Sequence, residues 1–163
     1  MYFFKLIDKK AIYLNSTATT KDEFLREISN NLHAQTYVEN AEKFYQALLY
    51  REESMLTALN GGVALPHGVS STVIKPVIAI SVLKNQGVDW NAEDHQNVKV
   101  IFTIASNKEN RDIQIECLQK VALYALENNF IDEILKANTP EDVLKALKQY
   151  YFDTQEDDDA EDI

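Results

Sequence analysis

One histidine, His67 in the stretch NGGVALPHGV (residues 60–69), carries the clearest chemical signal in the chain. With a reference pKa of about 6.5, an imidazole can act at neutral pH as a proton shuttle, a metal ligand or a nucleophile. Pro66 fixes its own φ and biases Leu65 toward an extended shape, so the backbone that enters His67 is stiff. Gly68 permits a sharp turn or a close approach by another chain. We therefore expect an imidazole held in a fixed direction at the end of a short strand, on the rim of a sheet.

Two of the chemical roles open to His67 lack the partners that they need. His33 and His95 are distant in sequence and there is a single cysteine, Cys117, so a metal site is disfavoured. A hydrolytic triad needs a serine or cysteine nucleophile in a recognisable setting, which GGVALPHG does not offer. A covalent nucleophile and a structural turn histidine remain, and local chemistry alone favours the structural role.

The composition limits the class of protein and its partners. The chain has 163 residues, of which 45% are hydrophobic, which suits one globular domain. Its 26 acidic residues against 16 Lys and Arg give a formal charge of −10, which argues against nucleic acid or an anionic membrane surface as the main partner. A single cysteine indicates a reducing, cytoplasmic location. We expect neither a signal peptide nor a membrane span.

The first half of the chain predicts a strand and two helices. A short strand is expected at residues 11–14, before a helix that Thr20 and Glu23 begin as a capping box. A second helix is expected at residues 39–53, with Met55 at the end of its apolar stripe. KPVIAISVL and VKVIFTIA then form nearly continuous apolar runs, which are typical of strands buried on both faces of a sheet.

The second half returns to a helical period. One helix is expected from about Asn110, with an apolar stripe that runs from Ile115 to Leu126. Thr139 as N-cap and Pro140 at the first helical position predict a last helix. The fold class is α/β, a single domain in which a mixed β-sheet is flanked by helices on both faces. We expect this domain to span residues 1–152, followed by an acidic, disordered tail at residues 153–163.

The segment REESMLTALNGGVALPHG, residues 51–68, resembles the active-site signature of the type 2 (fructose/mannitol) IIA components of the sugar phosphotransferase system (PTS). That signature has Arg-Glu, a threonine six residues after the arginine, a glycine-rich turn and then Ala-Ile-Pro-His-Gly. Leu65 replaces the usual isoleucine, and the resemblance extends to about Tyr151. The matching positions are Arg51, Glu52, Thr57, Gly62, Ala64, Pro66, His67 and Gly68.

The resemblance implies a phosphotransferase that works as a phosphohistidine relay. His67 would accept a phosphoryl group from the carrier protein HPr and pass it to a IIB protein or domain during sugar uptake. It implies no metal or other cofactor, no nucleic-acid partner and no direct membrane insertion, since contact with a membrane IIC component would run through IIB. The alternative is a regulatory, nitrogen-type IIA protein whose phosphorylation state controls binding to partner proteins.

The resemblance also implies roles for neighbouring residues. Arg51 and the Thr57 hydroxyl are candidates to stabilise the transferred phosphoryl group, and Pro66 and Gly68 would support His67. The alternatives are an arginine that caps helix carbonyls and a turn hydroxyl. Many family members carry a second histidine where this chain has Gln114, which can hydrogen-bond a phosphoryl oxygen but cannot carry charge or shuttle a proton. That difference indicates slower transfer or a regulatory role. Either ring nitrogen of His67 could carry the phosphoryl group.

Overall fold

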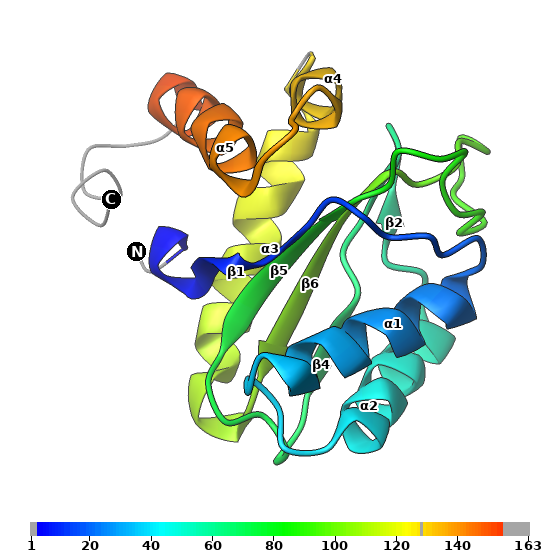
Figure 1. Cartoon of the computed structure of the whole chain (residues 1–163), viewed down its shortest axis with the longest axis vertical. Helices are drawn as coiled ribbons and strands as arrows, with labels where there is room; N and C mark the ends of the chain where they lie inside the picture. The colour runs from blue at the N-terminus through cyan, green and yellow to red at the C-terminus, as the bar shows by residue number, and fades with distance from the viewer. Residues whose placement is uncertain (1–2, 128, 155–163) are drawn as a thin grey trace.

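The computed structural model describes residues 3–127 and 129–154, which form helices packed on both faces of one β-sheet (Figure 1). The strand order is β1-β5-β6-β3-β2, and β4 pairs with β6 alongside that path. The strands are β1 (Ile7–Tyr13), β2 (Ala58–Leu59), β3 (Val63–Ala64), β4 (His67–Val69), β5 (Val77–Val82) and β6 (Val100–Ser106). The expected strand at residues 11–14 is the end of β1.

The sheet is mixed, as predicted. Strand β1 runs parallel to β5, and β3 and β4 both run parallel to β6. The pairs β5–β6 and β2–β3 are antiparallel. Strand β6 therefore lies at the centre of the fold, and it holds β4 in place by pairing His67 with Ile104 and Val69 with Ser106.

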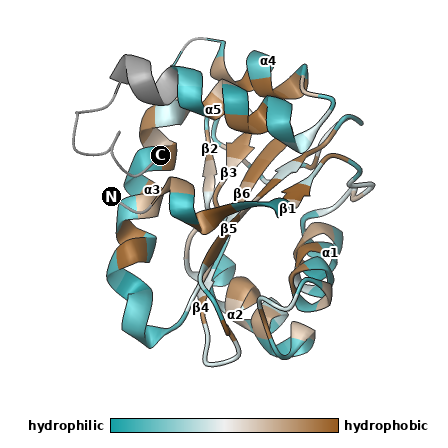
Figure 2. Ribbon diagram, turned by 60° about the vertical axis from the view of Figure 1, so that its left-hand side comes forward, coloured by the Kyte–Doolittle hydropathy of each residue, from teal (hydrophilic) through white to brown (hydrophobic). Residues whose placement is uncertain are grey.

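Two groups of helices cover the two faces of the sheet. Helices α1 (Lys21–Ala34) and α2 (Ala41–Ser54) lie on one face, and α3 (Arg111–Ala125), α4 (Phe130–Leu135) and α5 (Pro140–Thr154) lie on the other (Figure 1). Two short 3-10 helices, η1 (Phe4–Leu6) and η2 (Lys108–Asn110), precede β1 and α3. In β5, Ile78 and Ile80 pack into the core that contains α3, whereas Val77 and Ala79 pack into the core that contains α1 and α2. Because both of their faces are buried, β5 and β6 are mostly hydrophobic along their length, whereas β1 at the edge of the sheet carries the charged residues Asp8, Lys9 and Lys10 (Figure 2).

The helices begin where the capping residues predicted. The Thr20 hydroxyl accepts a hydrogen bond from the Glu23 N–H at 3.1 Å, although the Glu23 carboxylate bonds back to Thr19 rather than to Thr20. The Thr139 hydroxyl accepts from the Asp142 N–H at 3.1 Å in the same way. These side chains satisfy N–H groups that the first turn of a helix leaves without an intrahelical partner.

The expected apolar stripe of α2 is correct at Phe44 and Leu48 but wrong at its last member, and the expected stripe of α3 is wrong. Met55 is 66% exposed because α2 ends at Ser54 and the chain leaves it in an extended conformation. In α3 the stripe is displaced by one residue, since Ile115 and Leu126 are exposed. The buried side chains of this helix are Gln114, Cys117, Val121 and Tyr124. Apolar residues occur around most of the circumference of α3. Their spacing in the sequence therefore does not determine which face of the helix is buried.

The C-terminal helix continues past the predicted domain boundary. Helix α5 extends to Thr154, so residues 153 and 154 of the expected tail are helical. The rest of that tail, residues 155–163, lies outside the described residues. Within the described part of the chain, no helix combines the length and apolar character that a membrane span requires.

Candidate active site

His67 is the first residue of β4, not the last residue of a strand as the sequence suggested. Strand β3 ends at Ala64, and Leu65 and Pro66 separate it from β4, while both strands pair with β6. Pro66 has no N–H for the ladder, which explains the break. Its carbonyl still accepts a hydrogen bond from the Ile104 N–H at 3.0 Å. The backbone at Pro66, which the sequence predicts to be stiff, is therefore also hydrogen-bonded to the central strand β6.

The neighbours of Gly68 show on which face of the sheet His67 lies. A Cβ atom on Gly68 would lie 3.3 Å from Ala47 Cβ and 3.4 Å from the Leu48 nitrogen, so this residue faces α2. Because side chains alternate along a strand, His67 points to the opposite face, where its partner Ile104 packs in the core that contains α3. The close approach expected at Gly68 exists, but the neighbour is α2 of the same chain.

The His67 imidazole is buried and its orientation is fixed. Its Nδ1 lies 2.8 Å from the Leu65 carbonyl oxygen. A carbonyl can only accept a hydrogen bond, so Nδ1 carries the proton and Nε2 has the free lone pair. Burial lowers the pKa of His67, and the positive charge of Arg51 acts in the same direction. The Leu65 hydrogen bond and the Glu52 charge oppose this shift only in part. The neutral, nucleophilic form is therefore favoured at neutral pH.

Arg51 lies in the last turn of α2, close enough to His67 for its charge to affect the imidazole. Its Nη1 donates to the Met55 carbonyl at 2.9 Å, which is the capping role considered as the alternative. Within the described residues this is the one hydrogen bond that the guanidinium makes, so its other N–H groups are available to a ligand. Arg51 can therefore cap the end of α2 with one N–H group and bind an anion with the others.

Thr57 lies just after α2 and is buried. Its hydroxyl donates to Glu52 Oε2 at 2.7 Å, and its backbone N–H donates to Glu52 Oε1 at 3.1 Å. A hydroxyl has a single proton, so Thr57 has none left for a phosphoryl oxygen. This arrangement favours the turn-hydroxyl interpretation of Thr57 over direct contact with a phosphoryl group.

Gln114 lies at the same end of the sheet as His67. The Ser106 hydroxyl donates to Gln114 Oε1 at 2.7 Å, and both residues are buried. Ser106 pairs with Val69, two residues after His67, and projects from β6 on the same face as Ile104. The acceptor atom of the Gln114 amide is thus occupied, and its NH2 group remains as a donor. The sequence analysis assigned no role to Ser106, since a lone serine at the end of a strand carries no recognisable signal.

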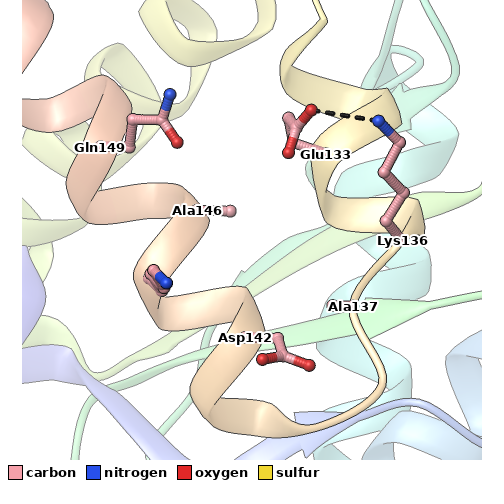
Figure 3. A pocket seen from close by; sticks show the side chains of 7 residues that line it. Glu133, Lys136, Ala137, Asp142, Ala146 and Gln149 are labelled. Atoms are coloured by element: carbon pink, nitrogen blue, oxygen red, sulfur yellow. Dashed lines mark hydrogen bonds and ion pairs between the residues drawn. The ribbon is translucent and has the colours of Figure 1, made fainter.

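Two surface hollows differ in their relation to this site. One of about 430 Å³ lies between α4 and α5, where Glu133 and Lys136 form an ion pair at 3.3 Å (Figure 3). These helices lie at the opposite end of the molecule from β4 (Figure 1). A second hollow of about 350 Å³ follows β4 directly and is lined by Val69, Lys108 and Arg111, among others. Only the second adjoins the site. No cluster of His, Cys, Asp or Glu suited to a metal ion occurs in the described residues.

The geometry defines a mixed α/β domain with one buried histidine that keeps a ring nitrogen free, and with an arginine whose charge lowers the pKa of that histidine. The chain belongs to the EIIA 2 family of the phosphoenolpyruvate-dependent sugar phosphotransferase system, whose family model matches residues 5–150. This match confirms the family that the sequence signature indicated. Members of the family are phosphotransfer proteins, which is consistent with a transferase role.

Curated relatives include proteins with and without further domains. The chain is 25% identical over 146 residues to the fructose-specific EIIABC component of Bacillus subtilis, covering 90% of this chain and 23% of that protein. The chain thus spans about a quarter of the length of this relative. It is 29% identical over 152 residues to the mannitol-specific enzyme IIA component of the same organism, with coverage of 89% and 98%.

Solved structures share the fold. The nitrogen regulatory protein IIA-Ntr from Neisseria meningitidis superposes with a TM-score of 0.79 at 22% identity, covering 88% of this chain and 97% of the other. The mannitol IIA enzyme from Escherichia coli, in its complex with phosphorylated mannitol IIB enzyme, superposes with a TM-score of 0.73 at 25% identity, with coverage of 88% and 99%. These likenesses confirm the α/β fold.

Proposed function

We propose that this chain is a phosphocarrier IIA component of a sugar phosphotransferase system, phosphorylated on Nε2 of His67. The observation that carries the proposal is the hydrogen bond from His67 Nδ1 to the Leu65 carbonyl, which leaves Nε2 as the nucleophile. Membership of the EIIA 2 family supports the same function. The phosphoryl donor is HPr, and the acceptor is a IIB protein or domain during sugar uptake.

In the accepting step, the lone pair of His67 Nε2 forms a bond to phosphorus. The phosphorus–nitrogen bond of the donor breaks, and its electron pair stays on the donor histidine. His67 then carries phosphorus on Nε2 and hydrogen on Nδ1, and the Leu65 carbonyl stabilises the positive charge of that ring. The free N–H groups of Arg51 and the amide of Gln114 face the charge on the phosphoryl oxygens. Catalysis of this kind is mostly positioning and charge stabilisation.

An apolar rim beside Arg51 supports docking of a partner protein at this site. Tyr50, Met55 and Leu56 are 81%, 66% and 44% exposed at the C-terminal end of α2. Exposed apolar groups around a polar centre are typical of protein interfaces. The Escherichia coli mannitol IIA enzyme was solved in complex with phosphorylated IIB, which makes a IIB component the expected acceptor here. Contact with a membrane component would run through IIB, and the site of action is the cytoplasm.

A regulatory role is the second candidate, because Gln114 occupies the position of the second histidine. A glutamine cannot take up a proton during transfer, and a slow carrier suits a protein whose phosphorylation state is read by partners. A sugar carrier discharges to a IIB component within its catalytic cycle, whereas a regulatory protein keeps its phosphoryl group. Transfer of the phosphoryl group to a IIB component therefore distinguishes the sugar carrier from the regulatory protein.

Intact-protein mass spectrometry tests the proposal directly. The wild type and His67→Ala are incubated with phosphoenolpyruvate, enzyme I and an HPr shown to phosphorylate another IIA protein. We expect the wild type to gain one acid-labile phosphoryl group and the variant to gain none. Absence of the gain in the wild type would refute the carrier function. Addition of a IIB protein then shows whether the group is passed on.

A further inference from the structure

The buried carboxylate of Glu52 receives more hydrogen bonds than any role assigned so far requires. Glu52 is 6% exposed, in the last turn of α2. Its Oε2 accepts from the Thr57 hydroxyl at 2.7 Å, and its Oε1 accepts from the Thr57 N–H at 3.1 Å. Oε1 also accepts from Trp90 Nε1 at 2.6 Å and lies 3.4 Å from Lys21 Nζ. A carboxylate removed from water needs such partners to stay charged.

Two of these partners anchor Glu52 to distant parts of the chain. Trp90 is fully buried in the loop between β5 and β6, and Lys21 begins α1. The Lys21 ammonium also lies 5.4 Å from the centre of the Trp90 ring system, within cation–π range. The carboxylate is thus fixed by groups that do not belong to α2, and its position does not depend on the end of that helix alone.

The other partner, Thr57, connects Glu52 to the reactive histidine. The Thr57 carbonyl accepts a hydrogen bond from the Leu65 N–H at 3.0 Å. The Leu65 carbonyl then accepts from His67 Nδ1 at 2.8 Å. Both polar groups of the Leu65 backbone are therefore used, one toward Thr57 and one toward the imidazole. A continuous series of hydrogen bonds runs from Glu52 through Thr57 and Leu65 to His67.

We propose that Glu52 is a positioning residue that, through Thr57 and Leu65, keeps the His67 proton on Nδ1 and the lone pair on Nε2. Its carboxylate aligns Thr57, which aligns the Leu65 peptide, whose carbonyl selects the ring tautomer. The consequence for phosphoryl transfer rests on the proposed function. The consequence for the tautomer does not, and it can be measured in the unphosphorylated protein.

The test is 15N NMR of the imidazole in four variants, at a pH where His67 is neutral. Glu52→Gln removes the charge at similar size, and Thr57→Val removes the hydroxyl at similar shape. Thr57→Ser keeps the hydroxyl. Glu53→Gln removes the same charge from the exposed carboxylate next to Glu52 and is the matched control.

We expect a single Nδ1–H tautomer in the wild type and in the two controls, Thr57→Ser and Glu53→Gln. Glu52→Gln and Thr57→Val should each show a mixture of the two tautomers. In phosphoryl transfer from HPr, both should lower kcat on the order of 10-fold to 100-fold with KM unchanged, as small misplacements of a reacting group do. Because they break the same series of bonds, the double variant should lose little more than either single variant.

A purely structural role predicts a different pattern. It would lower the urea midpoint of Glu52→Gln while leaving the tautomer and kcat at their wild-type values, and that result would overturn the proposal. If Glu52→Gln does not fold, Thr57→Val decides the question by the same two readouts. If the wild type accepts no phosphoryl group at all, the proposed function fails, and the NMR spectra still decide whether Glu52 sets the tautomer.

Discussion

The contact between β4 and α2 predicts the effect of adding one methyl group at Gly68. The Cβ of Gly68→Ala would lie 3.3 Å from Ala47 Cβ and 3.4 Å from both the Leu48 nitrogen and Phe44 Cε1. Two of these neighbours, the Cβ and the nitrogen, are fixed to the α2 backbone and cannot rotate away. The φ of Gly68 is not in the left-handed region, so the backbone itself accepts alanine.

The magnitude follows from two opposing effects in Gly68→Ala. Overpacking a buried contact by one methyl costs about 1 to 3 kcal/mol. Replacing glycine by alanine within a strand recovers about 0.5 to 1 kcal/mol of backbone entropy. We therefore expect the free energy of unfolding to fall by about 1 kcal/mol. Phosphoryl transfer should fall as well, because α2 carries Arg51 and β4 carries His67, and the added methyl separates the two.

Urea unfolding followed by circular dichroism measures this loss, and Ala47→Gly shows where it arises. Ala47→Gly alone costs about 1 kcal/mol as a glycine inside a helix. In the double variant, Ala47→Gly removes the 3.3 Å contact with the new methyl group. The double variant should therefore lose less free energy of unfolding than the sum of the losses in the two single variants. Strict additivity, or a more stable Gly68→Ala protein with unchanged transfer, would refute the argument that α2 confines β4.

Three further predictions concern the charges around the imidazole. Because the pKa of His67 is lowered in the folded state, the unfolded chain binds more protons as the pH falls through about 6.5. The stability of the wild type relative to His67→Gln, measured by urea titration, should therefore fall as the pH drops from about 7.5 to about 5.5. Arg51→Gln should raise the pKa of His67, measured by NMR titration, and slow phosphoryl transfer by about 100-fold. Gln114→His should add a titration near pH about 6.5 to the rate profile of transfer; an unchanged profile would place residue 114 away from the reacting group.

The sequence predicted the parts of the fold in which one local signal dominates. The Val- and Ile-rich runs became β5 and β6, and the capping residues Thr20 and Thr139 became the N-caps of α1 and α5. Each of these signals depends on neighbours within a few residues. The motif around His67 was predictable for the same reason, since its stiff backbone is encoded by Pro66 and its neighbours.

Features that depend on distant partners were not predictable. The buried face of α3 is chosen by the sheet, and its sequence tolerates either of two adjacent stripes. That His67 begins a strand depends on pairing with β6, which lies more than 30 residues further along the chain. Glu52 was matched to the signature without a role, because its hydrogen bonds to Trp90 and Lys21, which lie far away in the sequence, exist only in the folded chain.

The balance of donors at the site suits a protein that both accepts and releases a phosphoryl group. Strong stabilisation of the phosphorylated state would slow its release, since binding that is not specific to the transition state does not accelerate transfer. Here the Thr57 hydroxyl is committed to Glu52, and Gln114 contributes a neutral amide that Ser106 orients. In the proposed function, Arg51 is then the main positive charge offered to the phosphoryl oxygens. Because the Gln114 amide has no ionisable group, its contribution to the proposed phosphoryl site stays neutral while His67 changes state.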